Sequence, residues 1–199
     1  ELKNNDEINL VWEGLPHNIV YSAEAQNIIE YINEANRKKV FNKKIILNVI
    51  TDLYFYKYLN KYFLKNSFYE LLKKTSNIRF FEWNKLNFFK IITSNDLALI
   101  PLSQRNPMEY GKPSNKLFLF YKMNMPVIAS ATPAYKSIER ELNHKVTFEN
   151  ISDFQSILEH YIENKENREN YMKDANYLMQ NKYPESSIST SWDTALNHL

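Results

Sequence analysis

This sequence has no cysteine, no long apolar run and almost no net charge, and each absence excludes a class of protein. Without cysteine, its 199 residues form neither disulfide bonds nor thiolate metal sites, which fits a reducing compartment such as the cytoplasm. No apolar run approaches the ~20 residues of a membrane-spanning helix, and the opening ELKNNDE is not a signal sequence. The 25 basic and 23 acidic residues leave a net charge of +2, so we expect no surface that binds nucleic acid. These features predict a soluble, cytoplasmic protein.

Glycine is also scarce, since only Gly14 and Gly111 are present. The sequence lacks the phosphate loop G-x-x-x-x-G-K-[ST] and the G-x-S-x-G elbow of many hydrolases. It also lacks G-x-G-x-x-G after its first apolar run, which argues against a dinucleotide-dependent oxidoreductase. Both glycines lie in predicted loops.

Apolar residues make up 44% of the chain and aromatic residues 15%, enough for the core of one domain over residues 1–199. Short apolar runs alternate with stretches of helical periodicity. The runs predict six strands, at residues 8–12, 45–50, 78–83, 97–102, 126–130 and 146–148. Strands that are apolar throughout need cover on both faces. The pattern therefore predicts an α/β fold, a Rossmann-like, doubly wound parallel sheet of about six strands with helices on both faces.

Helices are predicted between these strands, and only helices after them. Within the sheet domain, about residues 8–150, they are expected at residues 22–38, 52–74, 84–92, 114–125 and 136–142. A helical C-terminal tail over about residues 152–199 is expected to hold helices at 153–164 and 166–182 and a last segment at 188–196. The polar residues available as N-caps are Ser22, Thr51 or Asp52, Asn84, Ser114 and Ser152.

The best candidate for a ligand site is the start of the helix at Ser114. Ligands of open parallel sheets bind outside the carboxyl ends of the strands, and this helix should open on the same crevice. Its first N–H groups, at Asn115, Lys116 and the following residue, have no intrahelical partners, and Lys112 and Lys116 flank them. Free N–H groups with two cations suit a phosphate or diphosphate. The alternative is a capped core helix beside a strand.

Four segments resemble the C-terminal, donor-binding domain of bacterial GT-B glycosyltransferases that build surface polysaccharide and lipopolysaccharide. They are, in order, NLVWEGLPHNI, RFFEWN, NDLALIPL and GKPSNKLFLFYKMNMPVIASATPAY. The similarity covers residues 8–148 in the same order and spacing, and its most specific part is residues 112–135, where KPSNKL precedes PVIAS.

The resemblance implies a nucleoside diphosphate sugar as substrate, with no metal or other cofactor. It implies donor contacts by Ser114, Asn115 and Lys116 for phosphate or ribose, by Trp83 and Asn84 for the base, and by the loop at Gly14. The expected partners are the N-terminal GT-B domain of the same protein, absent from this chain, and a glycan acceptor. The expected location is cytoplasmic, including the inner face of the membrane.

Three further residues are candidates from their positions alone. Lys112 and Arg105 could bind a phosphate, Arg105 through two parallel bonds, and His17 could contact phosphate or sugar or transfer a proton. For each, the alternative is a solvent-exposed side chain without a role. No residue is assigned as catalytic. The remaining histidines show no metal-ligand spacing, so no metal site is predicted.

One part of the sequence departs from the family pattern. Many retaining members carry a glutamate in the helix that begins at Ser114, and the matching residue here is Leu119. An earlier acidic residue of that motif falls at Gly111, with Glu109 nearby. This departure bears on the ribose contact and on assignment to the retaining subgroup. In that architecture the acceptor site belongs to the N-terminal domain, so the isolated domain is expected to bind donor but to be inactive. Two alternatives stay open: a GT-B-like module that binds without catalysis, and an unrelated doubly wound domain for a small ligand.

Overall fold

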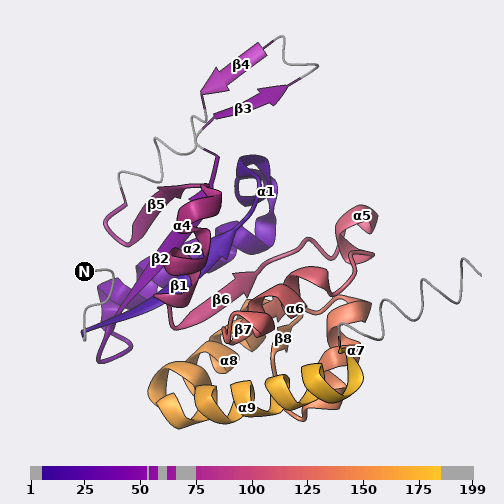
Figure 1. The fold of residues 1–199 in the computed structure, drawn as a ribbon. Coiled ribbons are helices and arrows are strands. Elements are labelled where there is room, and N and C mark those ends of the chain that lie inside the picture. Colours follow the sequence, from indigo (N-terminus) through magenta and orange to yellow (C-terminus); the bar gives the residue numbers. More distant parts are fainter. Residues whose placement is uncertain (1–5, 53, 58–61, 66–74, 185–199) are drawn as a thin grey trace, which may run out of the picture.

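The computed structural model describes residues 6–52, 54–57, 62–65 and 75–184. Its centre is a parallel sheet of six strands in the order β5-β2-β1-β6-β7-β8, with helices around it (Figure 1). The strands are β1 (Glu7–Glu13), β2 (Lys44–Thr51), β5 (Ile78–Glu82), β6 (Leu97–Ile100), β7 (Val127–Ser130) and β8 (Thr147–Phe148). The predicted fold class and all six predicted strands are confirmed.

The strand order reverses next to β1. From β1 the chain moves outward to β2 and then β5; it next returns to the other side of β1 and moves outward through β6, β7 and β8. This is the order of a doubly wound sheet, and its switch point lies between β1 and β6. The central strands are buried on both faces: every residue of β2 from Ile45 to Thr51, and all four residues of β6, are buried. The edge strand β5 is buried only at Ile78. β6 is shorter than predicted because Pro101 has no N–H for the sheet ladder.

Helices pack on the sheet and on one another. The helices are α1 (Pro16–Tyr21), α2 (Ala23–Lys38), α4 (Lys85–Thr93), α5 (Pro107–Tyr110), α6 (Asn115–Lys122), α7 (Pro133–Leu142), α8 (Ile151–Glu163) and α9 (Lys165–Lys182). α2 packs against β2, α8 contacts both α2 and α9, and α6 and α7 both pack against α9. Two buried tyrosines join α6 to α9, because the hydroxyls of Tyr121 and Tyr171 lie 2.7 Å apart. None of the helices in the described part of the chain has the length and apolar character needed to cross a bilayer.

The helix predicted over residues 52–74 is wrong where the structure describes it. Instead, β3 (Tyr54–Lys57) and β4 (Tyr62–Lys65) pair as an antiparallel hairpin beyond the end of β2 (Figure 1). Tyrosine and phenylalanine favour strands over helices. In the aromatic runs YFYK and YFLK this preference outweighs the helical periodicity on which the prediction was based. Residues 66–74 of this prediction, and the predicted segment at 188–196, lie outside the described residues.

Local capping differs from the prediction at three helix starts. The predicted loop after Gly14 contains α1, because Pro16 stands at its first turn, where a missing N–H costs nothing. Asn150, not Ser152, caps α8, and Asp153 N–H donates to its side chain at 3.0 Å. Ser114 is the N-cap residue of α6, but its side chain makes no cap hydrogen bond. The caps predicted at Ser22 and Asn84 are confirmed.

Candidate functional site

A cleft of 220 Å³ lies at the switch point, where β1, β6 and the first turn of α6 meet. The end of β1 contributes Trp12 and Glu13, and the end of β6 contributes Ile100 with the two residues after it. The full lining is Trp12, Glu13, Asn18, Ile100, Pro101, Leu102, Lys112, Pro113, Asn115, Lys116 and Tyr135. We call this the switch-point cleft. Of the predicted site residues, it brings together Lys112, Asn115 and Lys116.

Lys116 reaches from α6 to the end of β1, 103 residues earlier in the chain. Its ammonium lies 2.7 Å from Glu13 Oε2 and also donates a hydrogen bond to the Glu13 backbone carbonyl. Both side chains are partly buried, with 32% of Lys116 and 20% of Glu13 exposed. This ion pair holds the Lys116 ammonium near the N-terminal end of α6. Lys112, also partly buried, has no ion pair among the described residues and is the second cation of the cleft.

The first turn of α6 borders the cleft. Because Ser114 provides no side-chain cap, the leading N–H groups of α6 are not satisfied from that side chain. The N-terminal half of the helix dipole favours an anion there. Asn115 and Lys116, the first two residues of the helix, both line the cleft.

The end of β1 is shaped by the indole of Trp12. A Cβ at Gly14 would lie 2.8 Å from Trp12 Cζ2, so only glycine leaves room for the ring. The φ angle of Gly14 is not positive, so this close approach, rather than backbone conformation, requires glycine. Gly14 N–H donates to Ile50 O at 3.2 Å, and Thr51 Oγ1 donates to Gly14 O at 2.8 Å, which ties the loop to β2.

Trp83 and Asn84 follow β5, two strands away from β1, and are not among the lining residues. Asn84 is the N-cap of α4, since its Oδ1 accepts from Leu86 N–H at 2.8 Å. Trp83 is 44% exposed, and the centroid of its ring lies 6.4 Å from that of Phe88. Their expected contact with a base stays a prediction.

Arg105 and His17 are also outside the lining set. Arg105 is exposed in the segment between β6 and α5. His17 belongs to α1 rather than to a loop, and only its backbone is described. Their roles remain predictions.

The positions that the family pattern fills with carboxylates are occupied differently. Leu119 is 44% exposed on α6. Glu109 makes local hydrogen bonds in the segment after β6: its Oε2 accepts from Ser103 N–H at 2.6 Å, and its Oε1 accepts from the Asn106 side-chain amide at 3.5 Å. Glu109 is not part of the cleft lining.

Sequence reasoning missed Glu13, Asn18 and Tyr135 as individual cleft residues. Glu13 ends β1, and Asn18 and Tyr135 follow the carboxyl ends of β1 and β7, so their positions in the sequence indicated the crevice. Nothing in the sequence indicated that Glu13 pairs with Lys116. Tyr135, at the start of α7, is only 1% exposed, and this burial raises its pKa to about 12. Its phenol therefore stays protonated and neutral at physiological pH.

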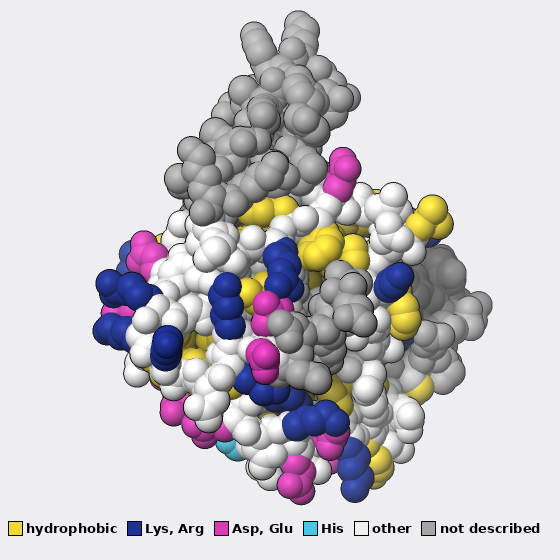
Figure 2. All heavy atoms as spheres, turned by 90° about the vertical axis from the view of Figure 1, so that its left-hand side faces the viewer, with side chains coloured by type: hydrophobic (Ala, Val, Ile, Leu, Met, Phe, Trp, Pro, Cys, Tyr) yellow, Lys and Arg dark blue, Asp and Glu magenta, His cyan; other side chains and the backbone are white. Residues whose placement is uncertain are grey.

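A larger hollow of 740 Å³ lies at the opposite, amino edge of the sheet. Its lining includes Lys39, Lys43 and Lys44, at the turn between α2 and β2. On the face in Figure 2, basic and acidic side chains are interspersed rather than gathered by sign. The position of the smaller cleft at the switch point makes it the better ligand site, because open parallel sheets bind ligands there. The described residues contain no group of three or more His, Cys, Asp and Glu side chains placed to hold a metal ion.

No protein-family model matches this sequence, and no curated protein is significantly similar to it. Solved structures do share its fold. WaaG, a glycosyltransferase involved in lipopolysaccharide biosynthesis, aligns over 90% of this chain and 44% of its own, with 15% identity and a TM-score of 0.63. TarM aligns over 92% of this chain and 34% of its own, with 14% identity and a TM-score of 0.62. The E. coli trehalose-6-phosphate protein bound with UDP-2-fluoro glucose aligns over 87% and 40%, with 10% identity and a TM-score of 0.55.

This chain therefore has the Rossmann-like fold of GT-B glycosyltransferases, as the resemblance predicted. It spans less than half the length of each of these three proteins. That share is consistent with the expected C-terminal domain.

Proposed function

We propose that this chain is the donor-binding half of a glycosyltransferase, and that the switch-point cleft holds the diphosphate of a nucleotide sugar. One observation carries the proposal: Lys112, Lys116 and the first turn of α6 open on the same cleft at the topological switch point. A diphosphate placed there meets two cations and the positive end of a helix dipole. The fold shared with WaaG supports the same reading.

The rest of the donor extends along the carboxyl edge of the sheet. β5 lies two strands from β1, which is about 10 Å at the usual strand spacing. A nucleoside diphosphate can span that distance, so Trp83 and Asn84 remain our candidates for the base, with the exposed indole as a stacking surface. Gly14 leaves room for the Trp12 ring, which lines the cleft.

In the reaction, a glycosyl group moves from the diphosphate to an acceptor hydroxyl of a surface glycan. Negative charge builds up on the leaving diphosphate, and Lys116, Lys112 and the N-terminus of α6 stabilise it there. The acceptor site, and any general base, belong to an N-terminal domain across the interdomain cleft. The reaction takes place in the cytoplasm, including the inner face of the membrane.

The test is calorimetric titration of this chain with UDP, GDP, ADP, CMP and their sugar conjugates. We expect selective binding of one diphosphate, with Lys116→Ala weakening it by about tenfold or more, since a charge-assisted hydrogen bond is lost. Lys122→Ala, an exposed lysine at the other end of α6, is the matched control and should leave affinity unchanged. Equal affinities for the two variants would contradict the proposal.

The exposed Leu119 favours a second candidate, a GT-B-like module that binds donor without catalysis. The two functions differ in turnover. The full-length protein, given the donor selected by calorimetry, should release free nucleoside diphosphate in the presence of acceptor if it is an enzyme. Binding without release would favour the non-catalytic module.

A further inference from the structure

The switch-point cleft contains a carboxylate that a simple phosphate site would not need. Glu13, the last residue of β1, places Oε2 at 2.7 Å from the Lys116 ammonium. Its Oε1 has no hydrogen-bond partner in the described part of the chain. The side chain is 20% exposed and lines the same cleft as Lys112 and Asn115.

A carboxylate can only accept hydrogen bonds, and it repels phosphate. A ligand made of phosphate alone would meet this repulsion and would compete with Glu13 for Lys116. A ligand that also carries hydroxyl groups would instead supply donors to Oε1. A cleft that holds a carboxylate beside an ammonium therefore fits a ligand that carries hydroxyl groups next to phosphate.

The Lys116 ammonium can serve both parts of such a ligand at once. It has three N–H bonds, and two of them are directed to Glu13, one to the carboxylate and one to the backbone carbonyl. The third remains for a phosphate oxygen. Glu13 therefore keeps its ion pair while Oε1 accepts from the ligand.

We propose that Glu13 accepts a hydrogen bond from a sugar hydroxyl of the donor and so makes the cleft select a nucleotide sugar over a bare polyphosphate. This inference rests on the proposed function, since it assumes that the diphosphate lies at Lys116. The hydroxyl belongs either to the ribose or to the transferred sugar, and the binding test below distinguishes them.

The test compares three kinds of ligand by calorimetry on the whole chain: inorganic pyrophosphate, the nucleoside diphosphates UDP, GDP and ADP, and their glucose conjugates. The variants are Glu13→Ala, Glu13→Gln and, as control, Glu7→Ala. Glu7 begins the strand that Glu13 ends and is also ion-paired, with Arg79 at 2.8 Å, but at the opposite edge of the sheet. Thermal unfolding of each variant checks that it is folded.

For Glu13→Ala we expect pyrophosphate to bind about fivefold more tightly, because a nearby like charge is gone. The affinity of the hydroxyl-bearing ligand relative to pyrophosphate should fall by about tenfold or more, because a hydrogen bond to a charged group is lost. If the ratio already falls for the nucleoside diphosphate, the hydroxyl is on the ribose; if it falls only for the glucose conjugate, it is on the transferred sugar. Glu13→Gln should raise pyrophosphate affinity similarly but lower the ratio less, since it keeps an acceptor oxygen.

An unchanged ratio of affinities would overturn the inference. If Glu13→Ala changes the affinities for all the ligands by the same factor, Glu13 acts only on Lys116 or on phosphate. In that case the wild-type chain still binds a nucleoside diphosphate, Lys116→Ala still weakens that binding, and the proposed function stands. If wild type binds none of the probes, the proposed function fails, and this inference fails with it.

Discussion

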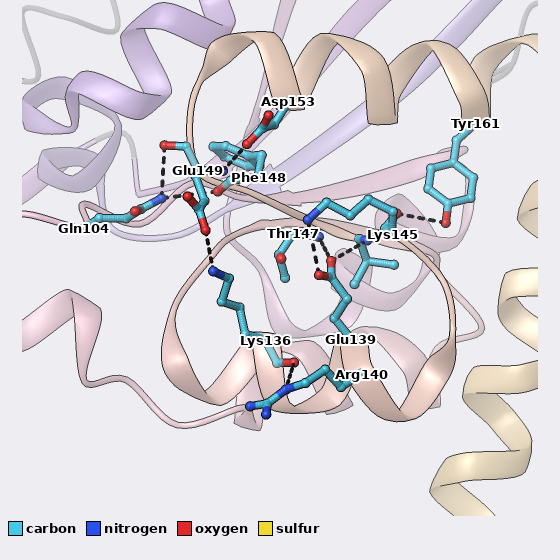
Figure 3. Close-up of polar contacts among 11 residues, drawn as sticks. Gln104, Lys136, Glu139, Arg140, Lys145, Thr147, Phe148, Glu149, Asp153 and Tyr161 are labelled. Atoms are coloured by element: carbon cyan, nitrogen blue, oxygen red, sulfur yellow. Dashed lines mark hydrogen bonds and ion pairs between the residues drawn. The ribbon is translucent and has the colours of Figure 1, made fainter.

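The carboxylate of Glu139 offers a sharp test of how the second half of the sheet is held together. Glu139 lies on α7 and reaches the start of β8, where its Oε2 accepts the N–H groups of Val146 at 2.8 Å and Thr147 at 2.5 Å (Figure 3). The Lys145 ammonium lies 3.2 Å from its Oε1. Val146 and Thr147 are fully buried, so no solvent replaces the carboxylate if it is removed.

Glu139→Ala should lower the free energy of unfolding by about 3 kcal/mol, because two buried N–H groups lose their acceptor at ~1–3 kcal/mol each. Glu139→Gln keeps one acceptor oxygen and should cost about 1 kcal/mol. For a domain of this size, these losses correspond to falls in Tm of roughly 6–12 °C and 2–4 °C. Urea unfolding at pH 7 measures both. The control is Glu30→Gln, an exposed residue of α2, which should change stability by less than about 0.5 kcal/mol.

The pH dependence of Glu139 follows from its environment. Burial raises the pKa of Glu139, but the N–H groups of Val146 and Thr147 and the ammonium of Lys145 lower it by more, so the pKa lies below its ordinary value. A carboxyl with a lowered folded pKa stabilises the fold fully above the unfolded value of about 4.3 and loses that effect as pH falls through the folded value. The stability gap between wild type and Glu139→Gln should therefore be constant above about pH 5.5 and shrink in acid. An equal gap at pH 7 and pH 3 would refute this reasoning.

Three further variants test the packing around the cleft and between the helices, all by denaturant unfolding. Gly14→Ala should cost about 1–3 kcal/mol, because its Cβ would lie 2.8 Å from a Trp12 ring that is only 5% exposed; unchanged stability would mean that the ring can move aside. Tyr121→Phe should cost about 1 kcal/mol, since Tyr171 loses one hydroxyl partner at 2.7 Å but keeps the Val127 carbonyl at 3.1 Å. Tyr171→Phe removes both of these bonds and also the one that its hydroxyl accepts from Val127 N–H at 3.4 Å, so it should cost more, and the reverse order would contradict this account.

The elements that sequence reasoning located correctly are those with a local cause. β2 and β6 were found because each is a run of mainly apolar residues, and β6 ends just before the proline that cannot join the ladder. The cap at Ser22 was found because a hydroxyl precedes an apolar helical pattern. The hairpin after β2 was missed because Tyr and Phe runs fit two periodicities over so few residues.

The candidate site was predicted in outline and missed in detail. Lys112, Asn115 and Lys116 were placed together correctly because they are neighbours at one helix start. Glu13 was not singled out as a site residue, since nothing near it in the sequence marks it as the partner of a lysine 103 residues later.

By itself, the sequence determined the strands, most of the helices, the parallel sheet and the helix start that borders the switch-point cleft, because each depends on residues within a few positions of one another. Tertiary structure alone decided that β1 and β6 are neighbours, that Lys116 meets Glu13 between them, and that the Trp12 ring excludes any side chain at Gly14. The order and register of strands set these contacts, and both come from packing the whole domain rather than from local pattern. The balance of charge that defines the cleft, a carboxylate held beside an ammonium, is therefore a property of the folded chain.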